Sequence, residues 1–73
     1  MTDLYNVFWK DPEGNQHKEL SYGNVEEMES ALTRLTNGPA ARGGIIKEVL
    51  VTDSMDCTLV LWREGKLIHP QIN

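Results

Sequence analysis

Apolar and polar residues alternate with the period of a β-strand near the start of the chain. Over residues 4–10, Tyr5, Val7 and Trp9 fall on one face of an extended segment, and Leu4 and Phe8 fall on the other. Apolar residues on both faces are typical of a strand that is buried on both sides. The pattern therefore predicts a strand over residues 4–10 that is either central in a sheet or covered on its outer face.

A turn and a second alternating segment follow this strand. The sequence Asp-Pro-Glu-Gly at 11–14 places proline at the second turn position, where its fixed φ fits, and glycine at the last. Leu20 and Tyr22 then alternate with polar residues over 17–22. Together these segments predict an N-terminal β-hairpin.

A helical period replaces the alternation after Asn24. Asn24 and Glu27 have the spacing of a capping box at a helix N-terminus. Gly38, in a left-handed conformation, and Pro39 are expected to end the helix. Leu32 and Leu35 are expected in the core. The apolar stripe consists of Val25, Met28, Ala31, Leu32 and Leu35.

The rest of the chain predicts further strands. Glu64 and Gly65 are typical of a two-residue hairpin connection in which glycine supplies a positive φ. Pro70 is expected to end the pairing of the last strand. The remaining expected elements are an irregular loop over 39–44, strands over 45–51 and 58–63, and a short strand at 67–68.

This order predicts an α+β fold in a single domain over residues 1–73, ββαββ(β), with one helix packed on a mostly antiparallel sheet. A mixed sheet is the alternative to an antiparallel one, and a ubiquitin-like grasp, which has the same early order of elements, stays open as the topology. A chain of 73 residues has room for one core. Cys57 is the only cysteine, so no intrachain disulfide forms and stability has to come from packing.

The charge pattern bears on the class of partner. The chain has 7 basic and 11 acidic residues, and the basic ones are scattered. Because proteins that neutralise phosphates need clustered Lys and Arg, we expect no direct, sequence-specific binding of nucleic acid. The acidic cluster Glu26, Glu27 and Glu29 is compatible with imitation of a phosphate path, but a solvated helix face is the commoner explanation.

Targeting signals and catalytic constellations are equally sparse. The longest apolar run, Leu59 to Trp62, is far too short to span a bilayer, and the acidic start lacks the basic and apolar regions of a signal peptide. We therefore expect a cytoplasmic protein that does not bind membranes. Cys57 with His17 or His69 is the nearest approach to a cysteine–histidine pair, but no third group orients it.

We expect Cys57 to be a buried or half-buried structural thiol. Gly43 and Gly44 precede a predicted strand and lack the lysine of a phosphate loop. No metal-ligand spacing is present in the sequence. The sequence thus predicts a protein that is not an enzyme and that uses neither a metal nor a cofactor.

The aromatic residues indicate a protein partner instead. Trp and Tyr are frequent in binding hot spots because they combine a large rigid area with one polar atom. One helix cannot cover both faces of the first and fourth strands, so part of their apolar surface should be exposed or used. The candidate residues are Tyr5, Val7, Trp9 and Lys10 with Arg42 for an N-terminal surface, and Trp62, Arg63 and Lys66 for a competing C-terminal hairpin.

As a whole, from its Met-Thr-Asp-Leu-Tyr start through its 73 residues, the chain resembles the small RNA-polymerase-binding proteins of lytic Xanthomonas phages. The resemblance implies a regulator that inhibits transcription initiation and promotes antitermination in the cytoplasm of the infected bacterium. The implied partner is the N-terminal region of the polymerase β′ subunit, near the β flap and the RNA exit channel. No local motif carries interface positions over to this chain. A small phage protein with another host target, such as an anti-defence factor, is the alternative.

Overall fold

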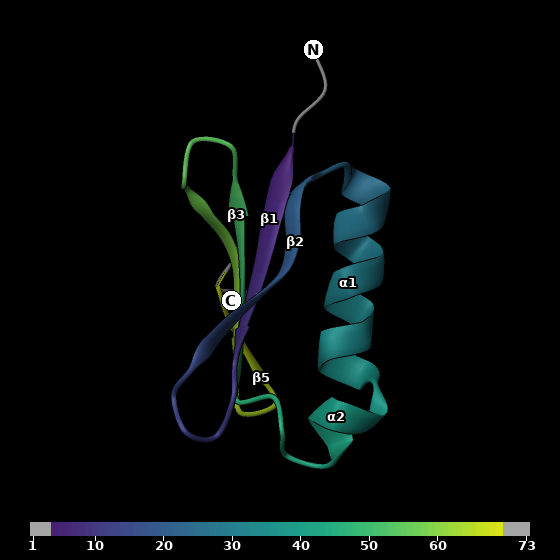
Figure 1. Cartoon of the computed structure of the whole chain (residues 1–73), viewed down its shortest axis with the longest axis vertical. Helices are drawn as coiled ribbons and strands as arrows, with labels where there is room; N and C mark the ends of the chain where they lie inside the picture. Colours follow the sequence, from purple (N-terminus) through teal and green to yellow (C-terminus); the bar gives the residue numbers. More distant parts are fainter. Residues whose placement is uncertain (1–3, 70–73) are drawn as a thin grey trace.

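Five strands and two helices follow one another in residues 4–69, the part of the chain that this computed structural model describes (Figure 1). In chain order they are β1 (Tyr5–Lys10), β2 (Gln16–Gly23), α1 (Val25–Asn37), α2 (Pro39–Arg42), β3 (Glu48–Asp53), β4 (Thr58–Arg63) and β5 (Lys66–His69).

The strands form one sheet in the order β2-β1-β3-β4-β5, and every neighbouring pair is antiparallel. β1 therefore lies between β2 and β3, which confirms the predicted central position of this strand in the sheet. The connection from β2 through α1 to β3 crosses β1, because β1 separates the two strands that it joins. The predicted α+β fold is confirmed, and of the two predicted kinds of sheet the antiparallel one is present and the mixed one is wrong.

Side chains hold both ends of the N-terminal hairpin. Asp11 Oδ1 accepts hydrogen bonds from the backbone N–H groups of Glu13 at 3.0 Å and of Asn15 at 2.9 Å. At the other end, the buried Asn6 accepts a hydrogen bond on Oδ1 from the N–H of Tyr22 at 3.1 Å. The pairing of β1 with β2 is thus closed by a polar side chain at each end.

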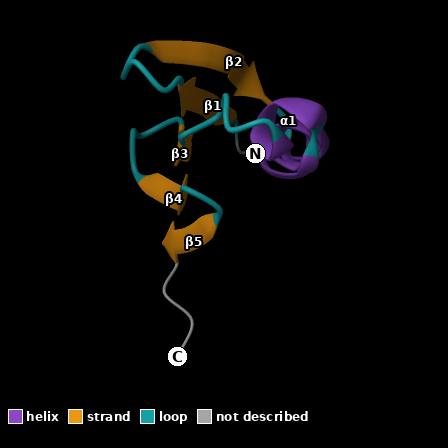
Figure 2. Cartoon of the chain, turned by 90° about the horizontal axis from the view of Figure 1, so that it is seen from below, coloured by secondary structure: helices purple, strands orange, loops and turns teal. Residues whose placement is uncertain are grey.

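The core lies between α1 and one face of the sheet (Figure 2). Val7, Val49 and Val51, from the two central strands β1 and β3, have no exposed surface. Ala31 and Leu35 of α1 are buried in the same cluster. The predicted core position of Leu35 is therefore confirmed.

Three members of the predicted helical stripe lie outside this buried core. Val25, in the first turn of α1, is 45% exposed, and Met28 and Leu32 are only partly buried. Leu32 lies at the margin of the core because α1 packs on β1, β2 and β3 rather than on β4 and β5. The prediction that Leu32 is a core residue is therefore wrong, and the apolar stripe extends beyond the part of α1 that is buried.

The capping box at the start of α1 is present as predicted. Asn24 Oδ1 accepts a hydrogen bond from the Glu27 N–H at 2.8 Å, and the Asn24 N–H donates to Glu27 Oε1 at 3.2 Å. These two bonds satisfy backbone donors that the first turn of a helix leaves without partners. The start of α1 is therefore determined by local interactions.

The end of α1 differs from the prediction in its backbone. Gly38 has φ −78° and ψ 176°, an extended rather than a left-handed conformation, because it precedes Pro39. Glycine is required there for another reason: a Cβ would lie 2.3 Å from the carbonyl oxygen of Arg34. Pro39 then begins the short helix α2, where an irregular loop was predicted.

β3 begins later than the predicted strand over 45–51 and runs over Glu48–Asp53. Ile46 is already buried in the core before the strand starts, and the N–H of Lys47 donates to the carbonyl of Lys10 at 2.8 Å. The apolar run in this segment has no single period, so the sequence pattern does not locate the first paired residue.

The C-terminal hairpin agrees more closely with its prediction. β4 has the predicted bounds, Thr58–Arg63. Glu64 and Gly65 form the connection with positive φ values of 49° and 84°, as a two-residue hairpin turn requires. β5 is longer than the two residues predicted for it. The expected stop at Pro70 lies outside the described residues.

Cys57 is exposed, so the prediction of a buried or half-buried thiol is wrong. It lies in the turn between β3 and β4, where Asp53 Oδ1 accepts hydrogen bonds from the N–H groups of Met55 at 2.8 Å and Cys57 at 3.0 Å. Hydrogen bonds from the backbone to this carboxylate hold the turn, and the exposed thiol contributes little to packing.

Candidate functional site

An apolar groove separates α1 from the C-terminal hairpin. α1 packs on β1, β2 and β3, whereas β4 and β5 continue the sheet beyond the area that α1 covers (Figure 2). Trp62 lies at this boundary, opposite Val49 of β3 on one side and Leu67 of β5 on the other. Because cross-strand partners share a face, all three side chains lie on the helix side of the sheet.

We call this cavity the Trp62 groove. Its first part has a volume of about 330 Å³ and its second part, toward α2, about 530 Å³. Volumes of this size accommodate side chains or a short segment of a ligand. The first part is lined by Leu32, Thr36, Asn37, Val60, Trp62, Gly65 and Leu67, and the second by Thr36, Ala41, Arg42, Gly44, Ile46, Lys47, Trp62, Glu64 and Gly65.

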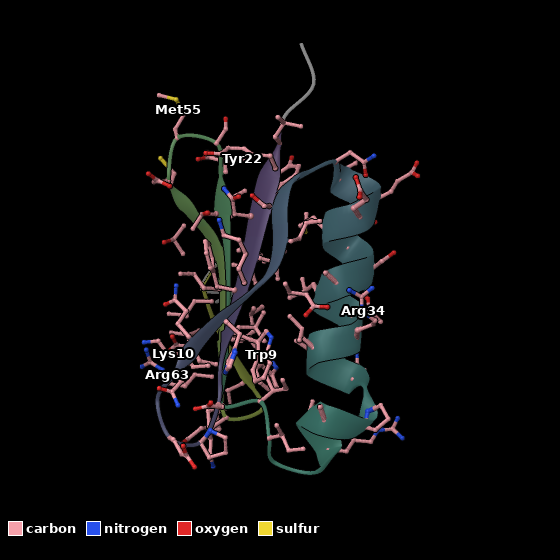
Figure 3. All side chains as sticks on the ribbon, viewed as in Figure 1. Trp9, Lys10, Tyr22, Arg34, Met55 and Arg63 are labelled. Carbon is pink, nitrogen blue, oxygen red and sulfur yellow. The ribbon has the colours of Figure 1, made fainter. Side chains whose placement is uncertain are left out.

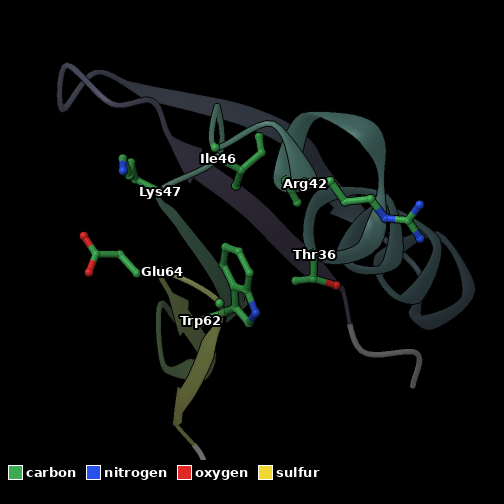
Figure 4. Close-up of a pocket in the computed structure, with 9 residues that line it drawn as sticks. Thr36, Arg42, Ile46, Lys47, Trp62 and Glu64 are labelled. Carbon is green, nitrogen blue, oxygen red and sulfur yellow. The ribbon is translucent and has the colours of Figure 1, made fainter.

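The groove has an apolar centre and a charged rim. In Figure 4 the Trp62 indole stands between Lys47 and Glu64 on one side and Arg42 on the other. The charged groups extend away from the indole, so they leave its ring free. Within residues 4–69, neither Arg42 nor Lys47 has a carboxylate within ion-pair distance. The groove thus offers an apolar anchor point with cations and one carboxylate at its margin.

The predicted N-terminal surface does not form as one exposed patch. Tyr5, Val7 and Trp9 point toward the helix side of the sheet, and Val7 is completely buried. The Trp9 ring stacks on His17 with a centroid distance of 4.2 Å and lies on the side that faces α1 (Figure 3). Val7 is therefore unavailable to a partner, and much of the Trp9 surface is already in use.

The structure divides the other predicted site residues between two surfaces. Arg42 and Trp62, from different predicted surfaces, line the same groove. Lys10 and Arg63 lie on the opposite face of the sheet, away from α1 (Figure 3). Both contact Glu48, Lys10 through Nζ at 3.5 Å and Arg63 through Nη2 at 2.8 Å.

That opposite face carries residues that the sequence reasoning missed. Phe8, Leu50 and Leu61 are cross-strand neighbours on β1, β3 and β4, and none belongs to the core under α1. The Lys18 ammonium lies 5.3 Å from the centre of the Phe8 ring. The sequence analysis placed Phe8 on the face of the first strand opposite to Trp9, but the local pattern did not show that the helices leave this face uncovered. We call it the open sheet face, with Phe8, Lys10, Lys18, Glu48, Leu50, Leu61, Arg63 and Lys66 as its residues.

Among the described groups, Asp11 is the one whose pKa is clearly shifted. A hydrogen bond from His17 Nε2 at 3.0 Å, assisted by the N–H groups of Asn15 and Glu13, lowers the pKa of the Asp11 carboxyl from 3.8 to about 2. His17 is thereby held near the β1–β2 turn. Cys57 lies at the other end of the strands, so these two residues form no catalytic pair. The side chain of His69 lies outside what the structure describes.

In the described part of the chain, no group of three or more His, Cys, Asp or Glu residues is placed to hold a metal ion. Neither α1 nor α2, the helices found in residues 4–69, has the length and hydropathy needed to cross a membrane. Comparison with models of known protein families, with curated proteins and with solved structures gave no match.

Proposed function

We propose that this protein is a regulator that acts by binding another protein, and that a polypeptide segment of its partner occupies the Trp62 groove. The resemblance of the whole chain to phage regulators supports host RNA polymerase as the partner, through the N-terminal region of β′ near the β flap and the RNA exit channel. Binding there would inhibit transcription initiation and promote antitermination. The place of action is then the cytoplasm of the infected bacterium.

The position of Trp62 at the uncovered edge of the helix layer is the observation that carries this proposal. The indole is only partly buried, and its cross-strand partner Leu67 is 48% exposed. Together with Val60 they form an apolar surface that α1 does not cover, and Leu32 of α1 lines its edge. Hot spots are commonly aromatic residues in such partly enclosed positions, surrounded by contacts that exclude water.

The experiment is a titration of isotope-labelled protein with the purified N-terminal segment of β′. We expect shifts at the Trp62 indole N–H and at the amides of Leu32 and Leu67. The substitution Leu67→Ala should weaken binding by about fivefold or more, the effect of losing a contact worth about 1 kcal/mol. Met55→Ala is the matched control, because Met55 is 80% exposed at the opposite end of the sheet.

Two results would contradict different parts of the proposal. If the β′ segment gives no shift and polymerase does not co-purify with the tagged protein from host lysate, then the partner is wrong and another host target takes its place. If the segment binds but the shifts omit Trp62 and Leu67, then the groove is wrong while polymerase stays the partner.

A further inference from the structure

The open sheet face lies on the side of the sheet opposite to the Trp62 groove, and its apolar residues Phe8, Leu50 and Leu61 are half-buried. Phe8 pairs with Leu50, and Leu50 pairs with Leu61, so an apolar row crosses β1, β3 and β4. Adjacent strands are about 4.8 Å apart, which places the three side chains in lateral contact range. Both helices of the described chain lie on the other face, so neither of them covers this row (Figure 2).

A second row of charged residues runs beside the apolar row. Glu48 is the cross-strand partner of both Lys10 and Arg63, and Arg63 is the partner of Lys66. Two residues along a strand correspond to about 7 Å, so this row flanks Phe8, Leu50 and Leu61 closely. Lys18 lies over the ring of Phe8 and adds a cation to the other row.

The charge of this face is opposite to that of the molecule. On the strands the cations Lys10, Lys18, Arg63 and Lys66 outnumber the carboxylate of Glu48, and they still outnumber the carboxylates when Asp11 and Glu64, which line the hollow beside Lys10 and Arg63, are included. In the chain as a whole, acids outnumber bases by four. Glu48 is only 14% exposed, held between Lys10 and Arg63, whose side chains stay 43% and 55% exposed. Arg63 uses Nε and Nη2 on Glu48, and a guanidinium has five N–H donors, so it can bind a further carboxylate.

The chemistry of the face selects the kind of partner. Single-stranded nucleic acids bind sheets through several exposed aromatic rings, but among the residues named for the open sheet face Phe8 is the only aromatic one. The apolar row needs aliphatic or aromatic side chains as its counterpart, and a phosphate backbone supplies none. A polypeptide with carboxylates beside apolar residues matches both rows.

We infer that the open sheet face binds an acidic polypeptide segment, with its apolar side chains on Phe8, Leu50 and Leu61 and its carboxylates on the flanking cations. This site is separate from the Trp62 groove and does not depend on the partner proposed for the groove. A protein with both sites holds two polypeptide segments on opposite faces of one sheet.

The test is a titration of the labelled full chain with a short blocked peptide composed of Leu and Glu. Shifts are expected at the amides of Phe8, Leu50 and Leu61, with the Trp62 indole N–H unchanged, and they should weaken as salt is added. Lys18→Gln and Lys66→Gln should each weaken binding by about twofold to fivefold, the range for exposed charge contacts. Arg34→Gln is the matched control, because it removes one cation from α1 on the other face.

Three comparisons decide the outcome. Equal binding of an analogue with Lys in place of Glu would overturn the charge argument. Tighter binding of an oligouridylate than of the peptide would assign the face to nucleic acid and overturn the inference. Lack of any shift at millimolar peptide would overturn it as well. The β′ titration is separate from all three, so failure here leaves the proposed function standing.

Discussion

Replacement of Leu35 by alanine tests the description of the core most directly. Leu35 is 6% exposed and lies in the cluster with Val7, Val49 and Val51. Truncation of a buried leucine removes transfer free energy and leaves a cavity, which together cost about 2–5 kcal/mol. A chain of this size has a total stability of roughly 4–11 kcal/mol, from about 0.05–0.15 kcal/mol per residue. Leu35→Ala should therefore remove a large fraction of the stability.

Leu32→Ala is the internal comparison, because Leu32 is one helical turn away and only partly buried. Its cost should be clearly smaller, since part of the side chain is already in water and the groove beside it can absorb the loss. Urea unfolding followed by tryptophan fluorescence measures both. With a slope of about 1–2 kcal/mol per molar urea, the Leu35 variant should shift its midpoint downward by about 1 M or more.

Equal costs for the two variants, or a larger cost for Leu32→Ala, would refute the placement of α1 over β1, β2 and β3. Such a result would mean that the helix is rotated or displaced toward β4, and the Trp62 groove would then be closed. The comparison thus tests the core and the candidate site with the same two variants.

Three further outcomes are expected. The pKa of the Asp11 carboxyl should be about 2 in the folded protein, so the stability that it contributes is present above pH 4 and is lost as the pH falls through 2. NMR of the carboxyl carbon measures this pKa, and a value near 3.8 in the folded protein would contradict the prediction. His17→Gln should move that pKa upward. Cys57→Ser should change the unfolding free energy by less than about 0.5 kcal/mol, and rapid reaction of the native thiol with a disulfide reagent would confirm its exposure. Gly38→Ala should cost more than about 1 kcal/mol in urea unfolding, because its Cβ meets the Arg34 carbonyl; a neutral effect would show that the two helices can separate.

Local signals in the sequence predicted the elements that depend on neighbouring residues. The capping box of Asn24 and Glu27 places the start of α1, and a two-residue turn with glycine at position 65 places the connection from β4 to β5. In each case the deciding atoms belong to residues within a few positions of one another. The α+β class also follows from the sequence, because one amphipathic helix between strand pairs leaves few other ways to bury its apolar side.

The candidate site could be predicted only in part. The sequence indicated that the apolar surface of β1 and β4 exceeds what one helix can cover, and both the Trp62 groove and the open sheet face follow from that excess. The sequence analysis assigned Arg42 and Trp62 to different surfaces. In the structure both line one groove, because the segment of Arg42, which was predicted as a loop, forms α2. The sequence analysis also attributed Lys10 and Arg63 to competing sites, whereas Glu48 joins them on one face.

The sequence by itself determined the helix, the turns, the strand periodicity and the fold class, since these depend on interactions between residues close together in the chain. The tertiary structure alone decided the strand order, the start of β3, the exposure of Cys57 and the side of the sheet on which each aromatic residue is used. These properties depend on pairing between distant segments and on how far one helix extends across a sheet of five strands. A local pattern shows which residues share a face, but it does not show what covers that face.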